Sequence, residues 1–367
     1  MLTRFSVENF KNFKDKLVWN LLDSSDFDFN KEIINNNCIT KGLILGVNGS
    51  GKSNLGLALF DIIFHITDKQ KLISKYNYYL NLDSSKSYAT FEYIFSFNGK
   101  EVIYQYKKKD VNTLLEEYLY IDKERVVFYD FINNKGNTTL RGAETLNMVS
   151  DKNLISRVKY IKSNAILEEN EINQVFYQFV EFIEHMLLFY SLDERGYQGL
   201  YVGGESISQG IIESGHVEKF EKFLHKNGID YQLVSKEIDE KKILYCKFRN
   251  GEANFFSIAS TGTVSLALLY YWYIKMSSAS FVFIDEFDAF YHFELAWNIV
   301  ELIKELYNSQ VFLSTHNTDL ISNDLMRPDC YFILEKNEIK NMYSSTEREL
   351  RKAHNLQKMY KAGLFYE

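Results

Sequence analysis

The first third of the chain alternates between apolar and polar residues in short runs, which is the pattern of β-strands with one buried face. The runs cover residues 2–8, 17–22, 88–97, 101–106, 116–121 and 125–130. Asn98-Gly99 separates two of these runs and is a strong signal for a tight hairpin turn. One helical pattern, residues 52–67, follows a short apolar run at 42–45. We therefore predict a β-rich lobe with one internal helix over residues 1–134.

The middle of the chain changes to helical periodicity. Apolar side chains recur at helical spacing over residues 165–190 and again over residues 216–226. The glycine-rich segment 196–215 between them is typical of a loop. Residues 135–235 are therefore predicted to form a helical insertion or lid.

After residue 240, strands that are apolar throughout alternate with helices. A β pattern at 242–248 precedes a helix beginning near residue 260, and another helix covers 293–307. The apolar strands are residues 281–285, 311–315 and 330–335. Fully apolar strands alternating with helices indicate βαβ units and a buried parallel sheet. We predict an α/β fold in which residues 236–367 complete the body begun by residues 1–134.

Composition narrows the classes of protein that this chain can belong to. The chain has 42 Lys+Arg and 49 Asp+Glu, a net charge of −7, which excludes a wholly cationic surface for nucleic acid but not a local basic stripe. Three cysteines without CxxC spacing argue against a disulfide framework and suit a reducing cytoplasm. Because no apolar stretch of about 18 residues and no signal-peptide pattern occurs, we expect a cytoplasmic protein without membrane contact.

The strongest chemical signal is the segment 46–53, which reads G-V-N-G-S-G-K-S and matches the phosphate-loop pattern G-x-x-x-x-G-K-[ST]. Glycines let successive backbone N–H groups surround phosphate oxygens, and the following helix adds positive charge at its N-terminus. Lys52 would neutralise the β- and γ-phosphates of ATP, and Ser53 would ligate Mg²⁺. A glycine-rich turn that merely precedes Lys-Ser is the alternative interpretation. The predicted nucleotide-binding residues are Gly46, Val47, Asn48, Gly49, Ser50, Gly51, Lys52, Ser53 and Asn54.

A second signal lies where the apolar strand 281–285 ends in two acids, Asp285 and Glu286, a Walker B pattern. Carboxylates at the end of a buried strand suit a cation or substrate site. Asp285 would hold Mg²⁺, and Glu286 would act as general base on the attacking water. The alternative is a strand that ends in a solvated acidic loop.

Two weaker motifs complete the set. Ser260-Thr261-Gly262 opens a helix about 20 residues before the Walker B pattern, where a hydroxyl and bare N–H groups can meet an anion. A simple N-cap serine would explain it equally well. His316 follows a buried strand and could contact the γ-phosphate or the attacking water, although a lone His there can also be structural.

The order of these motifs resembles that of ABC-type ATPases related to the structural-maintenance-of-chromosomes (SMC) and RecF proteins, and the opening FSVENFKNF is similar to their first strand. Residues 284–292, 314–323, 327–330 and 349–365 look more closely like bacterial AAA-family ATP-binding proteins of the abortive-infection and OLD-like kind. The resemblance implies a P-loop ABC/SMC-type ATPase head with a β-rich N-terminal lobe and a helical insertion.

The same resemblance implies ATP and Mg²⁺ as ligands and a nucleotide-sandwich homodimer. In such a dimer Ser260, Thr261 and Gly262 of one protomer close over the nucleotide of the other, while Lys52, Glu286 and His316 carry the hydrolysis. Relatives also carry a metal-ligating glutamine, for which Gln105 is the candidate, and His292 stands where SMC relatives have an aspartate. A separately encoded nuclease or toxin effector and a role in phage defence are implied as well.

Several alternatives remain open at this stage. A DNA-repair ATPase would need a basic track, a transporter subunit would fractionate with membranes, and a nuclease module has no room after Glu335. We expect the Lys107–Lys109 run to be a solvated hairpin end. The C-terminal segment is predicted to be a basic helix that could dock on an acidic partner, another protomer or nucleic acid; its basic residues are Arg348, Arg351, Lys352, Lys358 and Lys361.

Overall fold

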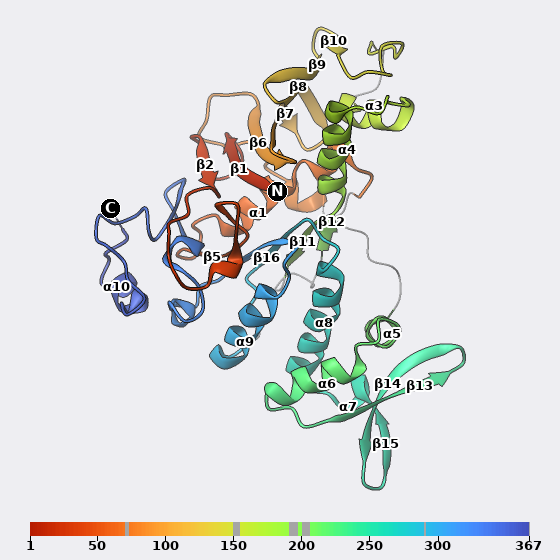
Figure 1. Cartoon of the computed structure of the whole chain (residues 1–367), viewed down its shortest axis with the longest axis vertical. Helices are drawn as coiled ribbons and strands as arrows, with labels where there is room; N and C mark the ends of the chain where they lie inside the picture. Colours follow the sequence, from red (N-terminus) through yellow and green to blue (C-terminus); the bar gives the residue numbers. More distant parts are fainter. Residues whose placement is uncertain (70–72, 150–154, 191–196, 200–205, 290, 367) are drawn as a thin grey trace.

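The computed structural model describes residues 1–69, 73–149, 155–190, 197–199, 206–289 and 291–366. Two seven-stranded sheets and a small projecting sheet organise this part of the chain. Figure 1 shows the antiparallel sheet at one end of the molecule, the small sheet at the other end, and the central sheet between them.

The central sheet confirms the predicted α/β class. Five of its strands run parallel, and an antiparallel strand lies at each edge. In spatial order the strands are β12 (Tyr197–Gly199), β11 (Met186–Tyr190), β16 (Phe281–Asp285), β17 (Gln310–Ser314), β5 (Lys41–Leu45), β18 (Tyr331–Glu335) and β19 (Glu338–Asn341). Since β5, β16 and β17 are parallel neighbours or next neighbours, the segments that follow them meet at one edge of the sheet.

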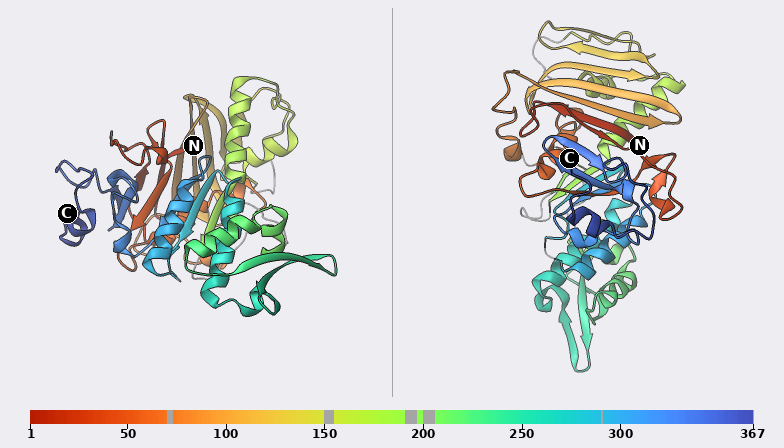
Figure 2. Two further views of the ribbon diagram at one scale, coloured as in Figure 1. Left: turned by 60° about the horizontal axis from the view of Figure 1, so that its bottom comes forward. Right: turned by 90° about the vertical axis from the view of Figure 1, so that its left-hand side faces the viewer.

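The second large sheet is antiparallel throughout and forms the broad upper layer in the right-hand view of Figure 2. Asn98 and Gly99 both have positive φ (51° and 77°), as the predicted hairpin between β6 and β7 requires. In spatial order its strands are β10 (Lys135–Thr138), β9 (Glu124–Asp130), β8 (Thr113–Ile121), β7 (Lys100–Asp110), β6 (Ala89–Phe97), β1 (Leu2–Glu8) and β2 (Leu17–Asn20).

Helix α1 (Lys52–Phe60) lies between the two large sheets. The Tyr93 hydroxyl of β6 donates to the carbonyls of Ala58 and Leu59 on one side of the helix. On the other side, a Cβ at Gly56 would lie 3.0 Å from Phe283 and 3.3 Å from Leu188, so the helix packs closely on β16 and β11. The close packing fixes where α1, and the loop before it, sit on the central sheet.

Helix α8 (Thr261–Met276) covers the opposite face of the central sheet. Leu188 of β11 points toward α1, whereas the next residue, Phe189, contacts Trp272 of α8 with ring centroids 5.4 Å apart. Successive side chains of a strand point to opposite faces, so α1 and α8 enclose β11 and its neighbours.

The remaining elements surround this core. A three-stranded sheet projects from the body beside α5, α6 and α7 (Figures 1 and 2) and consists of β13 (Gln232–Ile238), β14 (Lys241–Phe248) and β15 (Gly251–Asn254). A short pair comprises β3 (Ile34–Asn35) and β4 (Cys38–Ile39). The other helices are α2 (Ile63–Ile66), α3 (Arg157–Asn164), α4 (Glu171–Glu184), α5 (Ile207–Glu213), α6 (Val217–Lys226), α7 (Phe255–Ile258), α9 (Phe293–Lys304) and α10 (Leu356–Lys361).

The helix predicted over residues 165–190 is wrong at its C-terminal end. The helix α4 stops at Glu184, and Met186–Tyr190 form the fully buried strand β11, which pairs in parallel with β16. A short apolar run has no periodicity that separates a buried strand from a buried helix. The segment 135–235 therefore supplies strands to both large sheets as well as helices, and its expected end at 235 lies within β13. The three-part division of the chain remains a prediction.

Other local predictions are corrected as well. The helix expected over 52–67 breaks into α1 and α2 at Asp61. The described part of the expected loop 196–215 contains the helix α5, whose N-cap Ser206 accepts a hydrogen bond from the Gln209 N–H. At the C-terminus only Leu356–Lys361 is helical, so Arg348, Arg351 and Lys352 lie outside the expected basic helix.

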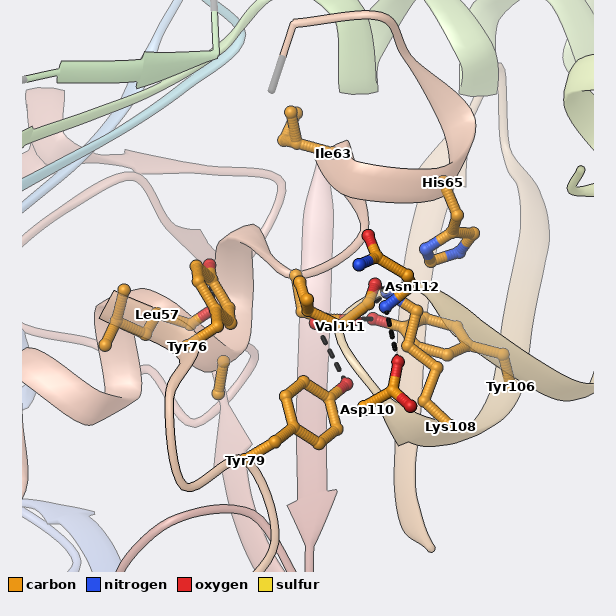
Figure 3. A network of polar contacts seen from close by, with 12 residues as sticks. Leu57, Ile63, His65, Tyr76, Tyr79, Tyr106, Lys108, Asp110, Val111 and Asn112 are labelled. Carbon is orange, nitrogen blue, oxygen red and sulfur yellow. Dashed lines mark hydrogen bonds and ion pairs between the residues drawn. The ribbon is translucent and has the colours of Figure 1, made fainter. Parts of the chain in front are cut away.

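The break at Asp61 coincides with a buried polar network between α1 and the antiparallel sheet. Lys108, expected in solvent, is completely buried and lies 2.8 Å from the Asp61 carboxylate. The Tyr79 and Tyr106 hydroxyls each donate to that carboxylate at 2.9 Å, and Figure 3 shows Tyr79 converging with Tyr106 and Lys108 of β7. Because each donor satisfies the carboxylate, the buried charge is compensated.

Cys38, Cys246 and Cys330 are all free and buried. Among the described residues, none of the helices has the length and apolar character needed to cross a membrane.

Candidate functional site

The phosphate loop joins β5 to α1 and bends through two glycines. Gly49 and Gly51 have φ of 78° and 104°, a region that glycine adopts without steric cost. A Cβ on Gly51 would lie 2.4 Å from the Asn12 side chain, whereas a Cβ on Gly49 would meet no atom within 4 Å. The loop therefore needs glycine at 51 for both conformation and space.

The start of α1 is open to an anion. Its N-cap, Gly51, has no side chain to cap the first turn, so the N–H groups there depend on another acceptor. The Ser50 hydroxyl is buried and has no hydrogen-bond partner among the described residues. Uncapped N–H groups and an unpartnered hydroxyl at the positive end of a helix fit a phosphate group.

Lys52 folds back over this loop. Its Nζ donates to the carbonyls of Gly46 (2.8 Å) and Val47 (3.3 Å) and lies 3.2 Å from Nδ1 of His316. Burial lowers the pKa of Lys52, and the carboxylates of Asp285 and Glu286 oppose this shift. The ammonium group is thus held at the point where the loop faces the end of β16.

The Walker B acids lie at the carboxyl end of β16, as predicted. Asp285 is buried, and the Ser314 hydroxyl donates to its Oδ1 at 2.6 Å. The same hydroxyl accepts from the Glu286 N–H at 2.8 Å. Glu286 has φ of 46°, an uncommon conformation for a residue with a side chain. Ser314 therefore holds both acids at once.

His316 lies between Lys52 and Glu286. Its Nε2 is 3.5 Å from Oε1 of Glu286, and 35% of its side chain is exposed. Because an ammonium group can only donate, Nδ1 is the acceptor toward Lys52, and Nε2 carries the proton toward Glu286. The structure thus brings together Lys52, His316 and Glu286, three residues predicted from separate motifs.

The signature segment lies at the start of α8. The Ser260 hydroxyl accepts from the Thr263 N–H at 3.1 Å and lies 2.9 Å from the Thr263 hydroxyl, which is an N-cap arrangement. Ser260, Thr261 and Gly262 are exposed. Their described hydrogen bonds stay within α8, so within this chain they are not joined to the phosphate loop.

Gln105 lies away from the other predicted residues. It sits in the middle of β7, where its Nε2 donates to Glu92 at 2.6 Å. Its neighbours Tyr104 and Tyr106 are buried on the side of the sheet that faces α1, so Gln105 points to the other side. The expectation that Gln105 ligates a metal at the phosphate loop is therefore not supported.

The other loop residues have distinct environments. Ser53 is exposed in the first turn of α1. The Asn54 side-chain amide donates to Oδ1 of Asn12 at 2.6 Å, which ties the helix to the segment after β1. Val47 and Asn48 are exposed. Asn12 and Ser314 were not predicted as site residues; the only sequence signal for Ser314 is its place two residues before His316.

The residues present fit a magnesium ion accompanied by phosphate oxygens. Among the described residues, no cluster of three His, Cys, Asp or Glu side chains could hold a metal by itself. Magnesium bound with a nucleotide, however, commonly has one or two protein ligands besides phosphate and water. Oδ2 of Asp285 accepts no hydrogen bond from the described residues, so it is free to bind a metal ion. Together with the Ser53 hydroxyl, it supplies oxygen ligands of the kind that magnesium prefers.

Comparisons with known proteins complete the description of the site. No functionally curated protein matches the sequence. The SMC head domain from Thermotoga maritima shares 14% identity over 92% of this chain and 97% of its own, with a TM-score of 0.46. An SMC head with an extended coiled coil, bound to the C-terminal domain of ScpA and derived from Pyrococcus furiosus, shares 12% identity over 92% and 95%, with a TM-score of 0.45.

The family assignment comes from the sequence of the chain itself. A family model described as "AAA domain, putative AbiEii toxin, Type IV TA system" matches residues 43–322. The match spans the phosphate loop, the Walker B acids and His316, and it confirms the predicted AAA-family resemblance. This chain belongs to the AAA domain family of putative AbiEii toxins of type IV toxin–antitoxin systems.

Proposed function

We propose that this protein is an ATP-binding and ATP-hydrolysing molecular switch that dimerises through ATP and regulates a partner effector. The observation that carries the proposal is the line formed by Lys52, His316 and Glu286, with 3.2 Å and 3.5 Å between successive polar atoms. It joins a phosphate-binding cation to a carboxylate through an imidazole. Membership of an AAA family supports the same class of activity.

Binding uses the open start of α1. The N–H groups of the loop and of the first helical turn surround the β- and γ-phosphates, and Lys52 exchanges its carbonyl partners for phosphate oxygens. Ser53 and Asp285 are the residues that hold Mg²⁺, which, when bound, neutralises charge on the transferred phosphoryl group.

Hydrolysis uses the acidic side of the site. Glu286 accepts the proton of the attacking water, and its φ of 46° turns the side chain out of the strand direction toward His316. The Nε2–H of His316 is available to donate to the γ-phosphate or to the water. Turnover is proposed to be slow, as suits a switch.

Dimerisation places a second copy over the nucleotide. Ser260, Thr261 and Gly262 are exposed at the start of a 16-residue helix, and a Cβ at Gly262 would meet only Ser260 at 3.8 Å. A helix N-terminus with free space around a glycine suits close approach to an anion. In the proposed dimer these residues cap the γ-phosphate bound by the partner protomer.

The effector part of the proposal rests on the resemblance set out from the sequence; the family description, which calls the AAA domain itself a putative toxin, supports only a toxin–antitoxin setting. We propose a nuclease or toxin encoded separately as the regulated partner and anti-phage defence as the setting. Direct DNA binding by this chain alone is less well supported, because its net charge is −7.

An ATPase assay combined with light scattering tests the proposal. Purified protein should release phosphate from Mg²⁺-ATP, and Lys52→Ala should lower that rate on the order of a hundredfold. Glu286→Gln should retain ATP and roughly double the scattering mass when ATP is added. Lys222→Ala, on the exposed face of α6, is the matched lysine control. No phosphate release by the wild type, or an unchanged mass of Glu286→Gln with ATP, would contradict the proposal.

A further inference from the structure

Two successive hydroxyls at the end of β17 donate to two carboxylates, one at the last residue of β16 and one in the turn that follows. Ser314 donates to Asp285 at 2.6 Å, and Thr315, the next residue, donates to Oδ2 of Asp288 at 2.8 Å. Ser314 and Thr315 are completely buried. The turn that carries Glu286 and the segment that carries His316 are therefore joined at two points.

The second of these points lies next to His316 in the chain. The Thr315 hydroxyl also accepts from the Asn317 N–H at 2.9 Å. On its other side, the Thr315 N–H donates to the Ile44 carbonyl of β5 at 3.1 Å. The residue before His316 is thus held directly by Asp288, and the residue after it is held by the same Thr315 hydroxyl.

The Asp288 carboxylate is not simply a solvated charge on the surface. It is half-buried, and burial raises its pKa, whereas the hydrogen bond from Thr315 acts in the opposite direction. Burying a carboxylate, even in part, destabilises the folded state unless hydrogen bonds or opposite charges compensate for the lost water. The compensating hydrogen bond here comes from Thr315, the residue before His316.

We propose that Asp288 is a positioning residue for His316 and acts through the Thr315 hydroxyl and Asn317. The inference rests on the proposed ATPase function. Asp288 does not touch the nucleotide; it fixes the backbone turn that aims the His316 ring between Lys52 and Glu286. Loss of Asp288 should therefore reduce turnover while leaving ATP affinity intact.

The test separates kcat from binding in a small set of variants. Asp288→Ala should lower kcat on the order of tenfold, as is usual when a supporting hydrogen bond is lost, while the Kd of a fluorescent ATP analogue changes less than about twofold. Asp288→Asn keeps an acceptor for Thr315 and should retain most of the activity. In a His316→Ala background, Asp288→Ala should cause no further loss.

A spectroscopic measurement provides evidence that does not depend on activity. With ¹⁵N-labelled histidine, Asp288→Ala should shift or broaden the ring signals of His316, identified by their loss in His316→Ala, and leave those of the six other histidines in place. Thr315→Val, if it folds, should do the same.

The possible results distinguish failure of the positioning role from failure of the proposed ATPase function. Undiminished kcat in Asp288→Ala, an equal loss in the His316→Ala background, or unchanged His316 signals would overturn the positioning role and leave the ATPase proposal standing. Absence of hydrolysis by the wild type would overturn both.

Discussion

Lys52 and His316 lie 3.2 Å apart, Nζ to Nδ1, although they come from the loop after β5 and the segment after β17. The contact exists because β5 and β17 are adjacent parallel strands, with Ser314 paired to Ile44. Parallel neighbours deliver their following loops to the same edge. His316 therefore gives the Lys52 ammonium group a hydrogen-bond acceptor besides the phosphate oxygens of a bound nucleotide.

The lowered pKa of Lys52 predicts how nucleotide binding depends on pH. Burial makes the ammonium form less favourable than in an ordinary lysine, so Lys52 loses its proton at a lower pH than usual. Because the phosphates favour the ammonium form, the apparent ATP affinity should fall as the pH rises past the lowered pKa of Lys52 in the free protein. Isothermal titration between about pH 7 and 10 measures this.

Lys52→Arg is the control for that titration. A guanidinium group keeps its charge throughout this range, so the ATP affinity of the variant should not fall as the pH rises. A wild-type affinity that stays constant up to pH 10 would contradict the prediction.

Ser314→Ala should weaken both the fold and the proposed reaction. It leaves the Asp285 carboxylate and the Glu286 N–H without their shared partner, which should cost about 1–3 kcal/mol of unfolding free energy. Urea unfolding measures the stability, and phosphate release measures turnover. Ser278→Ala is a suitable control, because that exposed hydroxyl lies just after α8 and donates to a nearby backbone carbonyl, that of Lys275.

The two positive-φ glycines of the phosphate loop should respond differently to alanine. Gly49→Ala adds a Cβ in open space and should cost only the conformational term, about 1 kcal/mol. Gly51→Ala adds the same strain and also places its Cβ 2.4 Å from the Asn12 side chain, which must move, so it should weaken ATP binding more than Gly49→Ala does. Equal ATP affinities in these two variants would show that the clash is relieved without cost.

Adjacent lysines of β7 should differ strongly in their effect on stability. Lys108→Ala leaves the Asp61 carboxylate buried without its cation and should cost about 3–5 kcal/mol. Lys107→Ala removes a partly exposed ion pair with Glu116 and should cost about 0–1 kcal/mol. Chemical denaturation of both variants makes the comparison.

A double variant isolates the charge from the packing at this position. Asp61→Asn in the Lys108→Ala background keeps one acceptor oxygen for the two tyrosine hydroxyls, Tyr79 and Tyr106, but removes the unpaired charge, so it should recover part of the lost stability. If the double variant is less stable than Lys108→Ala alone, the charge is not the cause.

The sequence predicts residues that act through local backbone geometry better than those that depend on distant neighbours. The phosphate loop and the acids after β16 carry their chemistry in consecutive residues, and the structure places Lys52, Glu286 and His316 together. Gln105 matches by residue type alone, and its position in β7 turns it away from α1. Neither the burial of Lys108 nor the strand conformation of Met186–Tyr190 could be predicted, because both depend on partners far along the chain.

The pairing of β5 has a consequence for synthesis on the ribosome. Among the described residues, the strands bonded to β5 are β17 and β18, which span Gln310–Ser314 and Tyr331–Glu335. The antiparallel sheet, made mostly of consecutive hairpins, can assemble from residues 2–138 while the rest is still being translated. The strand that leads into the phosphate loop must wait until residue 314 has emerged, so a truncated product ending before β17 would hold that loop on an unpaired strand.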